Sequence, residues 1–542
     1  AAGSGAACPT GSSGSSAPAP AAASACLEEA RRTLEAGRVH AGLALLLRAH
    51  RRAAGEGPGG AASAKLAGQL AEKLYQQQPA LVPVAARRGG SLLLKEPLGA
   101  GARCPAERAD GGASSPATVS ADGGRSGGAE GSHGAADAKL RYEPWLCGGE
   151  VPRVDCAGPE GFQEALRMIS RRVPVIMENL GLMPRTSKWS LDYLREHTNE
   201  WPGMNVLKSA GGDNRYLYYV GAQPDRDMSA FEGAPRQASQ DLRMSFEGFL
   251  RAARDDPDGR YYLQAPLVLR DAQADGTVNE VWSKGIDGRL RADCDRDVDR
   301  SRLAAIEEAG CFGHWSRSQL FVGPSESLSP IHYDQYDNIF MQVAGIKRFL
   351  LFDPRAAEGL YPFPVAHPYD EYAMIDLERI DGQTFPRARS ALEGRGAVAV
   401  LKPGEAMYIP THWWHHVQGG APRGAWSISV NFWYNIYQVM LKPPHPLPLH
   451  LELELARHAE LLLGDCCGSA HVGRLAALLR RDVDDEEVGS EDAVTAPTRN
   501  FLLYRLARLL GPGEVRSFVH EHFAPERFDH GAVMSALRGP TR

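Results

Sequence analysis

The sequence lacks the cysteine patterns of a disulfide framework or a structural zinc site. Its 542 residues include nine cysteines, an odd number, and no two of them are spaced as Cys-x-x-Cys. Such a set predicts neither a network of paired disulfides nor a tetrahedral metal site. Reduced thiols in the cytosol or the nucleus are the simpler interpretation, and we expect the protein there.

Long apolar runs and an excess of positive charge are also missing. No stretch reaches the ~20 apolar residues that a membrane-spanning helix needs, so we expect no membrane association. The first residues are rich in Ala, Gly, Ser and Pro and lack the charged and leucine-rich regions of a secretory signal. The formal net charge is -6, whereas a general nucleic-acid binder carries a basic surplus. We therefore do not expect a nucleic-acid partner.

The composition divides the chain into five parts. Residues 1–25 are of low complexity and predicted to be disordered. Residues 26–97 have Leu and Ala at helical spacing and fit two or three helices, which we interpret as a docking appendage. Residues 98–139 have the composition of a flexible Gly/Ser/Ala linker. The main domain then covers residues 140–440, and residues 441–542 form a C-terminal helical region.

The main domain consists of short runs rich in β-branched and aromatic residues. Gly, Pro, Asp or Asn separates these runs, which include VPVIMENL, RYLYYV, NIFMQVAG, KRFLLFDP and WSISVNFWYN. This pattern predicts many short strands, as in a β-sandwich or barrel with flanking helices. Beyond residue 450 the apolar period becomes helical, and four amphipathic segments predict four helices.

The central signal is SPIHYDQYD, which contains His332 and Asp334. On a strand, residues two apart face the same side, so these side chains could supply two corners of a metal site. His-x-Asp alone is weak evidence, because a histidine often precedes an aspartate by chance. The cluster HWWHHV supplies histidines downstream, of which we select His415. Strand alternation places His412 and His416 on the opposite face from His415.

Two further observations strengthen the metal interpretation. Lys347 follows in IKRFLLFDP, on what we take to be the next strand, where a buried ammonium would need a negative partner such as a dicarboxylate. Lys347 and Arg348 should face opposite ways. In SVNFWYN, Asn431 and Trp433 share one face, where Asn could donate to a carboxylate and Trp could wall a pocket. Ordinary core packing of Trp433 and a solvated edge position for Lys347 are the alternatives.

These segments together resemble the JmjC-type oxygenases, and among them most of all the asparaginyl hydroxylase that inhibits hypoxia-inducible factor. The resemblance rests on residues 323–345, KRFLLFDP, LYPFPVAHPYD, KPGEAMYIPTHWWHHV and ISVNFWY. It spans roughly residues 143–437 and is dense only from about 317 to 437. It implies a mainly β fold built on a double-stranded β-helix, the jelly roll of cupins. It also implies Fe(II), 2-oxoglutarate and O2 as cofactor and co-substrates.

The resemblance also assigns roles to individual residues. It implies that His332, Asp334 and His415 bind iron and that Lys347 pairs with the distal carboxylate of 2-oxoglutarate. Ser329 stands where the family enzyme has Thr, which keeps the hydroxyl and loses a methyl group. The remaining positions that hold the co-substrate are Tyr262, Asn338 and Asn431, and those near the substrate are Trp433 and Gln264.

One departure from the family pattern concerns the substrate. After LYPFPVAHPYD the chain reads Glu371-Tyr372, where the asparaginyl hydroxylase has Arg-Gln. Tyr372, a candidate substrate contact, cannot offer the amide that binds a target asparagine. Asparagine as the target residue is therefore in question, although the iron chemistry is unaffected.

The leading functional hypothesis is hydroxylation of a protein or peptide side chain. N-methyl-lysine demethylation, hydroxylation of an RNA nucleoside and a catalytically silent binding module are the alternatives, because one fold hosts several functions. The C-terminal helices either pack on the barrel or form a homodimer interface, as the resemblance implies.

Overall fold

The computed structural model describes residues 22–52, 58–83, 140–198, 201–209, 214–217, 239–256, 261–272, 277–367, 369–420, 425–436, 443–485, 494–529 and 531. The expected linker at 98–139 and most of the low-complexity segment at 1–25 lie outside these residues. The chain forms two compact units, Ala1–Val84 with Leu478–Val519 and Ala85–Ala477 with His520–Arg542. The grouping thus joins segments from the two ends of the chain in one unit.

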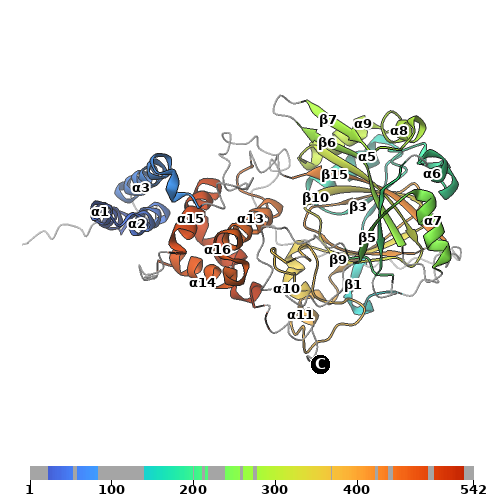
Figure 1. The fold of residues 1–542 in the computed structure, drawn as a ribbon. Helices are drawn as coiled ribbons and strands as arrows, with labels where there is room; N and C mark the ends of the chain where they lie inside the picture. The colour runs from blue at the N-terminus through green and yellow to red at the C-terminus, as the bar shows by residue number, and fades with distance from the viewer. Residues whose placement is uncertain are drawn as a thin grey trace, which may run out of the picture. The chain divides into compact units, whose positions relative to one another are not determined.

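The larger unit contains two β-sheets (Figure 1). The smaller sheet has the order β1 (Cys147–Glu150), β12 (Gly396–Leu401), β11 (Lys347–Phe352), β14 (Trp414–Gly419) and β9 (Leu328–His332). The larger sheet has the order β2 (Arg153–Asp155), β3 (Val175–Glu178), β13 (Ala406–Ile409), β10 (Tyr336–Ala344), β15 (Trp426–Asn435), β8 (Trp315–Pro324), β6 (Tyr261–Ala272), β4 (Met204–Lys208) and β5 (Gln240–Met244), and β7 (Val278–Trp282) pairs with β6.

The eight strands β8 to β15 cross between the two sheets along the chain. Strands β8, β10, β13 and β15 lie in the larger sheet, and β9, β11, β12 and β14 lie in the smaller one. Neighbouring members of each set pair antiparallel. This is a double-stranded β-helix, and it confirms the predicted fold class. Of the expected strand RYLYYV, only Arg215, Tyr216 and Leu217 are described, and Arg215 forms an isolated bridge.

The alternation of side chains along β10 explains why its sequence is apolar almost throughout. Ile339 and Met341 belong to the core outside the larger sheet, together with apolar residues of the flanking helices. Phe340 lies between them in sequence and packs inside the barrel with Phe349 of β11. Because successive side chains point to opposite faces, a strand covered on both sides must be apolar at nearly every position.

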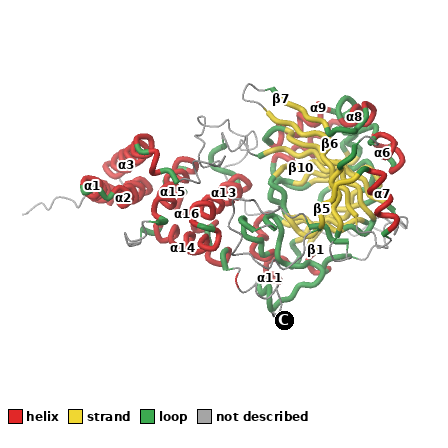
Figure 2. Tube along the Cα trace, viewed as in Figure 1, coloured by secondary structure: helices red, strands yellow, loops and turns green. Residues whose placement is uncertain are grey.

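Helices flank the barrel in this unit (Figure 2). Four of them begin at a side-chain cap, namely Ser190 before α6, Ser245 before α7, Asp287 before α8 and Asp299 before α9. No helix among the described residues is long and apolar enough to cross a membrane. The helices of this unit are α5 (Pro159–Ser170), α6 (Leu191–His197), α7 (Phe246–Asp255), α8 (Gly288–Cys294), α9 (Arg300–Gly310), α10 (Ala357–Leu360), α11 (Ala388–Leu392) and α13 (Leu449–Cys467).

The smaller unit joins the N-terminal helices to the C-terminal helix α15. It contains α1 (Ala22–Glu35), α2 (Val39–Arg51), α3 (Pro58–Gln77) and α15 (Ala496–Leu510), and the helices α14 (Val472–Val483) and α16 (Val515–His522) cross its boundaries. The helices predicted at both ends of the chain are therefore present. Helix α1 begins inside the segment that we expected to be disordered.

Specific contacts fix α15 against the N-terminal helices. The ring of Tyr75 in α3 stacks on Tyr504 with 4.5 Å between centroids and meets Phe501 edge-on. Nδ2 of Asn500 donates a hydrogen bond to the carbonyl of His40 over 2.9 Å. Most residues of α15 are buried, including polar ones. The homodimer that the resemblance implies stays a prediction, and it would need surfaces other than the buried faces of this helix.

Candidate metal centre and its cavity

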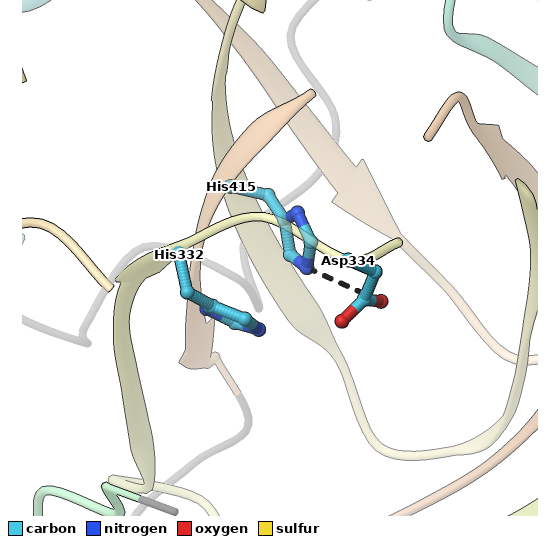
Figure 3. Close-up of side chains that lie close together, drawn as sticks. All are labelled: His332, Asp334 and His415. Carbon is cyan, nitrogen blue, oxygen red and sulfur yellow. Dashed lines mark ion pairs between the residues drawn. The ribbon is translucent and has the colours of Figure 1, made fainter. Parts of the chain in front are cut away.

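Two neighbouring strands of the smaller sheet bring His332, Asp334 and His415 together. His332 ends β9 and pairs directly with His415 in β14. Their ring centroids lie 4.2 Å apart, and Nε2 of His415 lies 3.8 Å from Oδ2 of Asp334. One potential ligand atom from each residue lies within 4.8 Å of the other two. Figure 3 shows the three side chains pointing toward one another. We expected Asp334 on the same strand as His332, but it lies two residues beyond the end of β9. Its side chain still points toward the two imidazoles (Figure 3).

Both histidines are held in the form that a metal requires. Nδ1 of His332 lies 2.7 Å from the carbonyl of Pro330, and Nδ1 of His415 lies 2.9 Å from that of Trp413. A proton on Nδ1 satisfies these contacts and leaves the lone pair of Nε2 for an ion. Burial lowers the pKa of both imidazoles to about 4, so both are neutral at neutral pH. Burial raises the pKa of Asp334 in the absence of a cation.

The two other histidines of the cluster have different surroundings. His412 has a left-handed backbone conformation with φ of 62°, and its ring packs on Tyr333. The ring of His416 meets that of Tyr142 edge-on. Neither residue belongs to either of the two groups of potential metal ligands found among the described residues, His332 with Asp334 and His415, and Glu452 with Glu521 and His522. The choice of His415 thus agrees with the geometry, although its role in binding iron remains a prediction.

A cavity of about 410 Å³ opens from the three ligands into the barrel. Every other residue that the sequence suggested for the site lines this cavity. These residues are Tyr262, Gln264, Ser329, Asn338, Lys347, Tyr372, Asn431 and Trp433.

Lys347 is an almost completely buried cation in this cavity, with 2% of its surface exposed. Its ammonium donates hydrogen bonds to Oη of Tyr262 (2.9 Å) and Oγ of Ser429 (3.0 Å). None of the ion pairs among the described residues includes Lys347, and burial lowers its pKa to about 7. We expected Lys347 on the strand directly after that of His332. Along the chain, however, β10 lies between β9 and β11, so Lys347 is on the second strand after His332. Arg348 is only half-buried and does not line the cavity.

The cavity also contains buried acceptors without partners. The side-chain oxygens of Asn338 and Asn431 have no hydrogen-bond partner within the described parts of the chain. Buried polar groups are normally paired, so these atoms and the ammonium of Lys347 suit a polar molecule that enters the cavity. Two neutral imidazoles and one carboxylate on one side of an ion match the facial set that non-haem Fe(II) prefers. The residues therefore fit iron together with a dicarboxylate.

Sequence reasoning missed several polar residues that line or support the cavity, among them Ser429, Arg317 and Gln319. Ser429 binds Lys347 from β15, two positions before Asn431. Arg317 and Gln319 line the cavity from β8, and the guanidinium of Arg317 lies 4.2 Å from the ring centre of Trp433. The sequence did contain a signal for them. Polar residues recur at every second position in SRSQLF and SISVNFW, and on a strand this spacing places them on the same face as Asn431 and Trp433 or on the matching face of the neighbouring strand.

The departure from the family pattern, Glu371-Tyr372, lies beside the metal ligands. Tyr372 stacks on His332 with 5.3 Å between ring centroids. Glu371 lines the cavity and accepts a hydrogen bond from the amide of Gln335. Burial, with repulsion from Asp370, raises the pKa of Glu371 to about 8. Its backbone has φ of 77°, a strained conformation for a residue with a side chain.

A jelly roll of this topology, with a candidate metal site between its sheets' strands, is typical of the cupin-like class of proteins. The model of the cupin-like domain family matches residues 160–438, about half of the chain, and the chain belongs to this family. It is similar to three proteins whose alignments cover 21–23% of this chain and about a quarter of each relative's length. They are Jumonji C domain-containing protein 5 of Drosophila melanogaster (35% identical over 116 residues), HSPB1-associated protein 1 of Bos taurus (34% over 123) and lysine-specific demethylase JMJ30 of Arabidopsis thaliana (32% over 128).

Proposed function

We propose that this chain is an Fe(II)- and 2-oxoglutarate-dependent oxygenase that hydroxylates a side chain of a protein. The observation that carries the proposal is the convergence of the three potential ligand atoms within 4.8 Å, at the mouth of a cavity that holds a buried lysine. Iron with 2-oxoglutarate and O2 would supply the oxidising chemistry. The protein would supply geometry, orientation and the exclusion of bulk water.

Each group of residues has a distinct task in this proposal. His332, Asp334 and His415 would hold the iron and leave one side of it open. Lys347, with Tyr262 and Ser429 behind it, would bind the distal carboxylate of the co-substrate. Ser329, Asn338 and Asn431 would complete the polar lining. Trp433, Gln264 and Tyr372 would face the substrate.

Demethylation of N-methyl-lysine is the second candidate. Two observations favour it, namely the name of the Arabidopsis relative, a lysine-specific demethylase, and the buried carboxyl of Glu371 near the candidate metal ligands. Burial and Asp370 keep this carboxyl mostly protonated at neutral pH, and a cationic substrate beside it would favour its ionised form, because opposite charges attract strongly at low dielectric. The two reactions would share the iron centre, and in demethylation the oxidised carbon is the N-methyl group, whose hydroxymethyl product breaks its N–C bond and releases formaldehyde.

The test is incubation of the purified protein with Fe(II), 2-oxoglutarate and a tryptic digest of a cell extract, followed by mass spectrometry. The proposal predicts peptides that gain 16 Da and succinate formed in step with them. Loss of 14 Da from methylated lysines would instead identify the demethylase. His416→Ala, a buried histidine on the other face of β14, serves as the control for His415→Ala.

A silent binding module gives a different result in the same experiment. Such a module would bind iron but release no succinate above the level of the His332→Ala variant, with or without the digest. That outcome would overturn the proposal.

A further inference from the structure

The wall that carries Glu371 and Tyr372 belongs to a loop, not to a strand of the barrel. This loop meets β9 and the turn after it through two backbone hydrogen bonds. The amide of Tyr333 donates to the carbonyl of Glu371 over 3.0 Å, and the amide of Ala373 donates to that of Ile331 over 3.2 Å. With a strained backbone at Glu371, the loop needs further support to hold one position.

Helix α13 supplies this support through a buried ion pair. The guanidinium of Arg457 contacts the carboxylate of Asp370, the residue directly before Glu371. The two side chains are only 11% and 8% exposed. One turn further along α13, Oε1 of Glu460 accepts a hydrogen bond from the amide of Val365 over 3.0 Å. Two side chains on one helix therefore hold this loop at Val365 and at Asp370.

A second connection runs from α13 to the turn between β13 and β14. The carboxylate of Glu454 is buried and lies between two imidazoles, 3.3 Å from Nε2 of His412 and 3.1 Å from Nε2 of His458. The backbone amide of His412 in turn donates to the carbonyl of Asp334 over 2.9 Å. Glu454 thus contacts the residue that supports a predicted metal ligand.

We propose that Arg457 and Glu454 are positioning residues of the active site. Arg457 sets the place of Glu371 and Tyr372 through Asp370, and Glu454 sets the turn that meets Asp334. This inference rests on the proposed function. Removing one member of a buried pair leaves an uncompensated charge, so the loop should shift or loosen. A displacement of about 1 Å at the substrate can reduce turnover on the order of 100-fold.

The test compares the full chain with Arg457→Met, Arg457→Lys and the control Arg474→Met, an exposed arginine on α14. The probes are 2-oxoglutarate with Fe(II) alone, and the peptide that gives the highest yield of the 16-Da product in the screen above. Arg457→Met should raise the KM for this peptide by about 10- to 100-fold. Succinate formation without peptide should stay within about twofold of the parent, and Arg457→Lys should recover part of the loss.

Hydrogen exchange provides a readout that does not depend on activity. Amides of residues 369–373 should exchange faster in Arg457→Met than in the parent, whereas those of β9 and β14 should not. The double variant Asp370→Asn/Arg457→Met removes both charges, and it should show the same loss of peptide binding with a stability closer to the parent's.

Two results would overturn the inference. One is an unchanged peptide KM in Arg457→Met. The other is an equal loss of succinate formation with and without peptide, which is what a merely structural role predicts. A parent protein that forms neither succinate nor hydroxylated peptide, yet shows the predicted change in exchange, would contradict the proposed function and leave the positioning role standing.

Discussion

Two parts of the cavity are built in different ways: the candidate metal corner, formed by His332, Asp334 and His415, and the candidate substrate wall, formed by Glu371 and Tyr372. His332 and His415 sit on paired strands, and the backbone holds each ring through its Nδ1. Glu371 and Tyr372 sit on a loop that α13 holds through one ion pair, Arg457 with Asp370, and one hydrogen bond, from the amide of Val365 to Glu460. The difference is that strand pairing and backbone hydrogen bonds hold the two imidazoles, whereas side-chain contacts from a helix hold the loop with Glu371 and Tyr372. Variants of His332 or Asp334 should therefore impair iron binding, whereas variants that loosen the loop with Glu371 and Tyr372 should impair substrate binding.

The largest effect is expected at the metal corner. His332→Ala or Asp334→Ala should weaken Fe(II) binding by more than about 100-fold, because even a residue behind a ligand contributes 10- to 100-fold. Calorimetric titration with Fe(II) under anaerobic conditions measures this. The control His416→Ala should keep the affinity of the parent, and equal affinity in His332→Ala would remove this residue from the metal site.

The next effect concerns the co-substrate. Lys347→Ala should raise the KM for 2-oxoglutarate at least ~30-fold, since losing one partner of a buried charge pair costs about 2 kcal/mol or more. Iron affinity should change little. Steady-state succinate formation measures the constant, and Arg348→Ala on the same strand is the matched control. A KM that stays at the parent's value would show that the dicarboxylate lies elsewhere.

The pH dependence should follow from the same lysine. Its pKa is about 7 in the empty cavity, and a bound dicarboxylate would raise it. Above pH 7 the free amine is mostly neutral and must take up a proton on binding. The affinity for 2-oxoglutarate should therefore fall as pH rises from 7 to 9, by up to about tenfold per pH unit. Calorimetry in buffers of different ionisation enthalpy should detect the proton taken up on binding. An affinity for 2-oxoglutarate that stays constant from pH 7 to 9 would contradict this prediction.

The smallest effect on turnover is expected in the helical unit. Tyr75 is buried against Phe501 and Tyr504, so Tyr75→Ala should reduce the stability of this unit by about 3–5 kcal/mol. Faster hydrogen exchange at α15 is the measurement, with succinate formation unchanged. Tyr75→Phe should be nearly neutral, because the buried hydroxyl has no hydrogen-bond partner among the described residues. If the backbone amides of α15 exchange as slowly in Tyr75→Ala as in the parent, the ring stacking contributes little to the stability of this unit.

Much of the metal corner could be predicted because its determinants are local. The spacing of two between His332 and Asp334 and the run of strands around them depend on short segments. Choosing His415 among three neighbouring histidines needed the resemblance, since alternation alone does not tell which face is inside. The period of two that places Ser429 and Arg317 in the cavity was present in the sequence, but we had not used it.

Other features depend on tertiary contacts that no local pattern encodes. Nothing in LHLELELARHAELLL indicates that Arg457 would contact Asp370, 87 residues earlier in the chain. The N-terminal helices read as a docking appendage, yet they pack on a helix near the other end of the chain. An amphipathic face predicts that a helix is covered but not by which segment.

The most direct measurement is anomalous diffraction at the iron edge from crystals grown without oxygen in the presence of Fe(II) and 2-oxoglutarate. Our account predicts one iron bonded to Nε2 of His332, Nε2 of His415 and a carboxylate oxygen of Asp334, with the distal carboxylate of 2-oxoglutarate on Lys347. An iron peak elsewhere, with these three side chains free of metal, would contradict it.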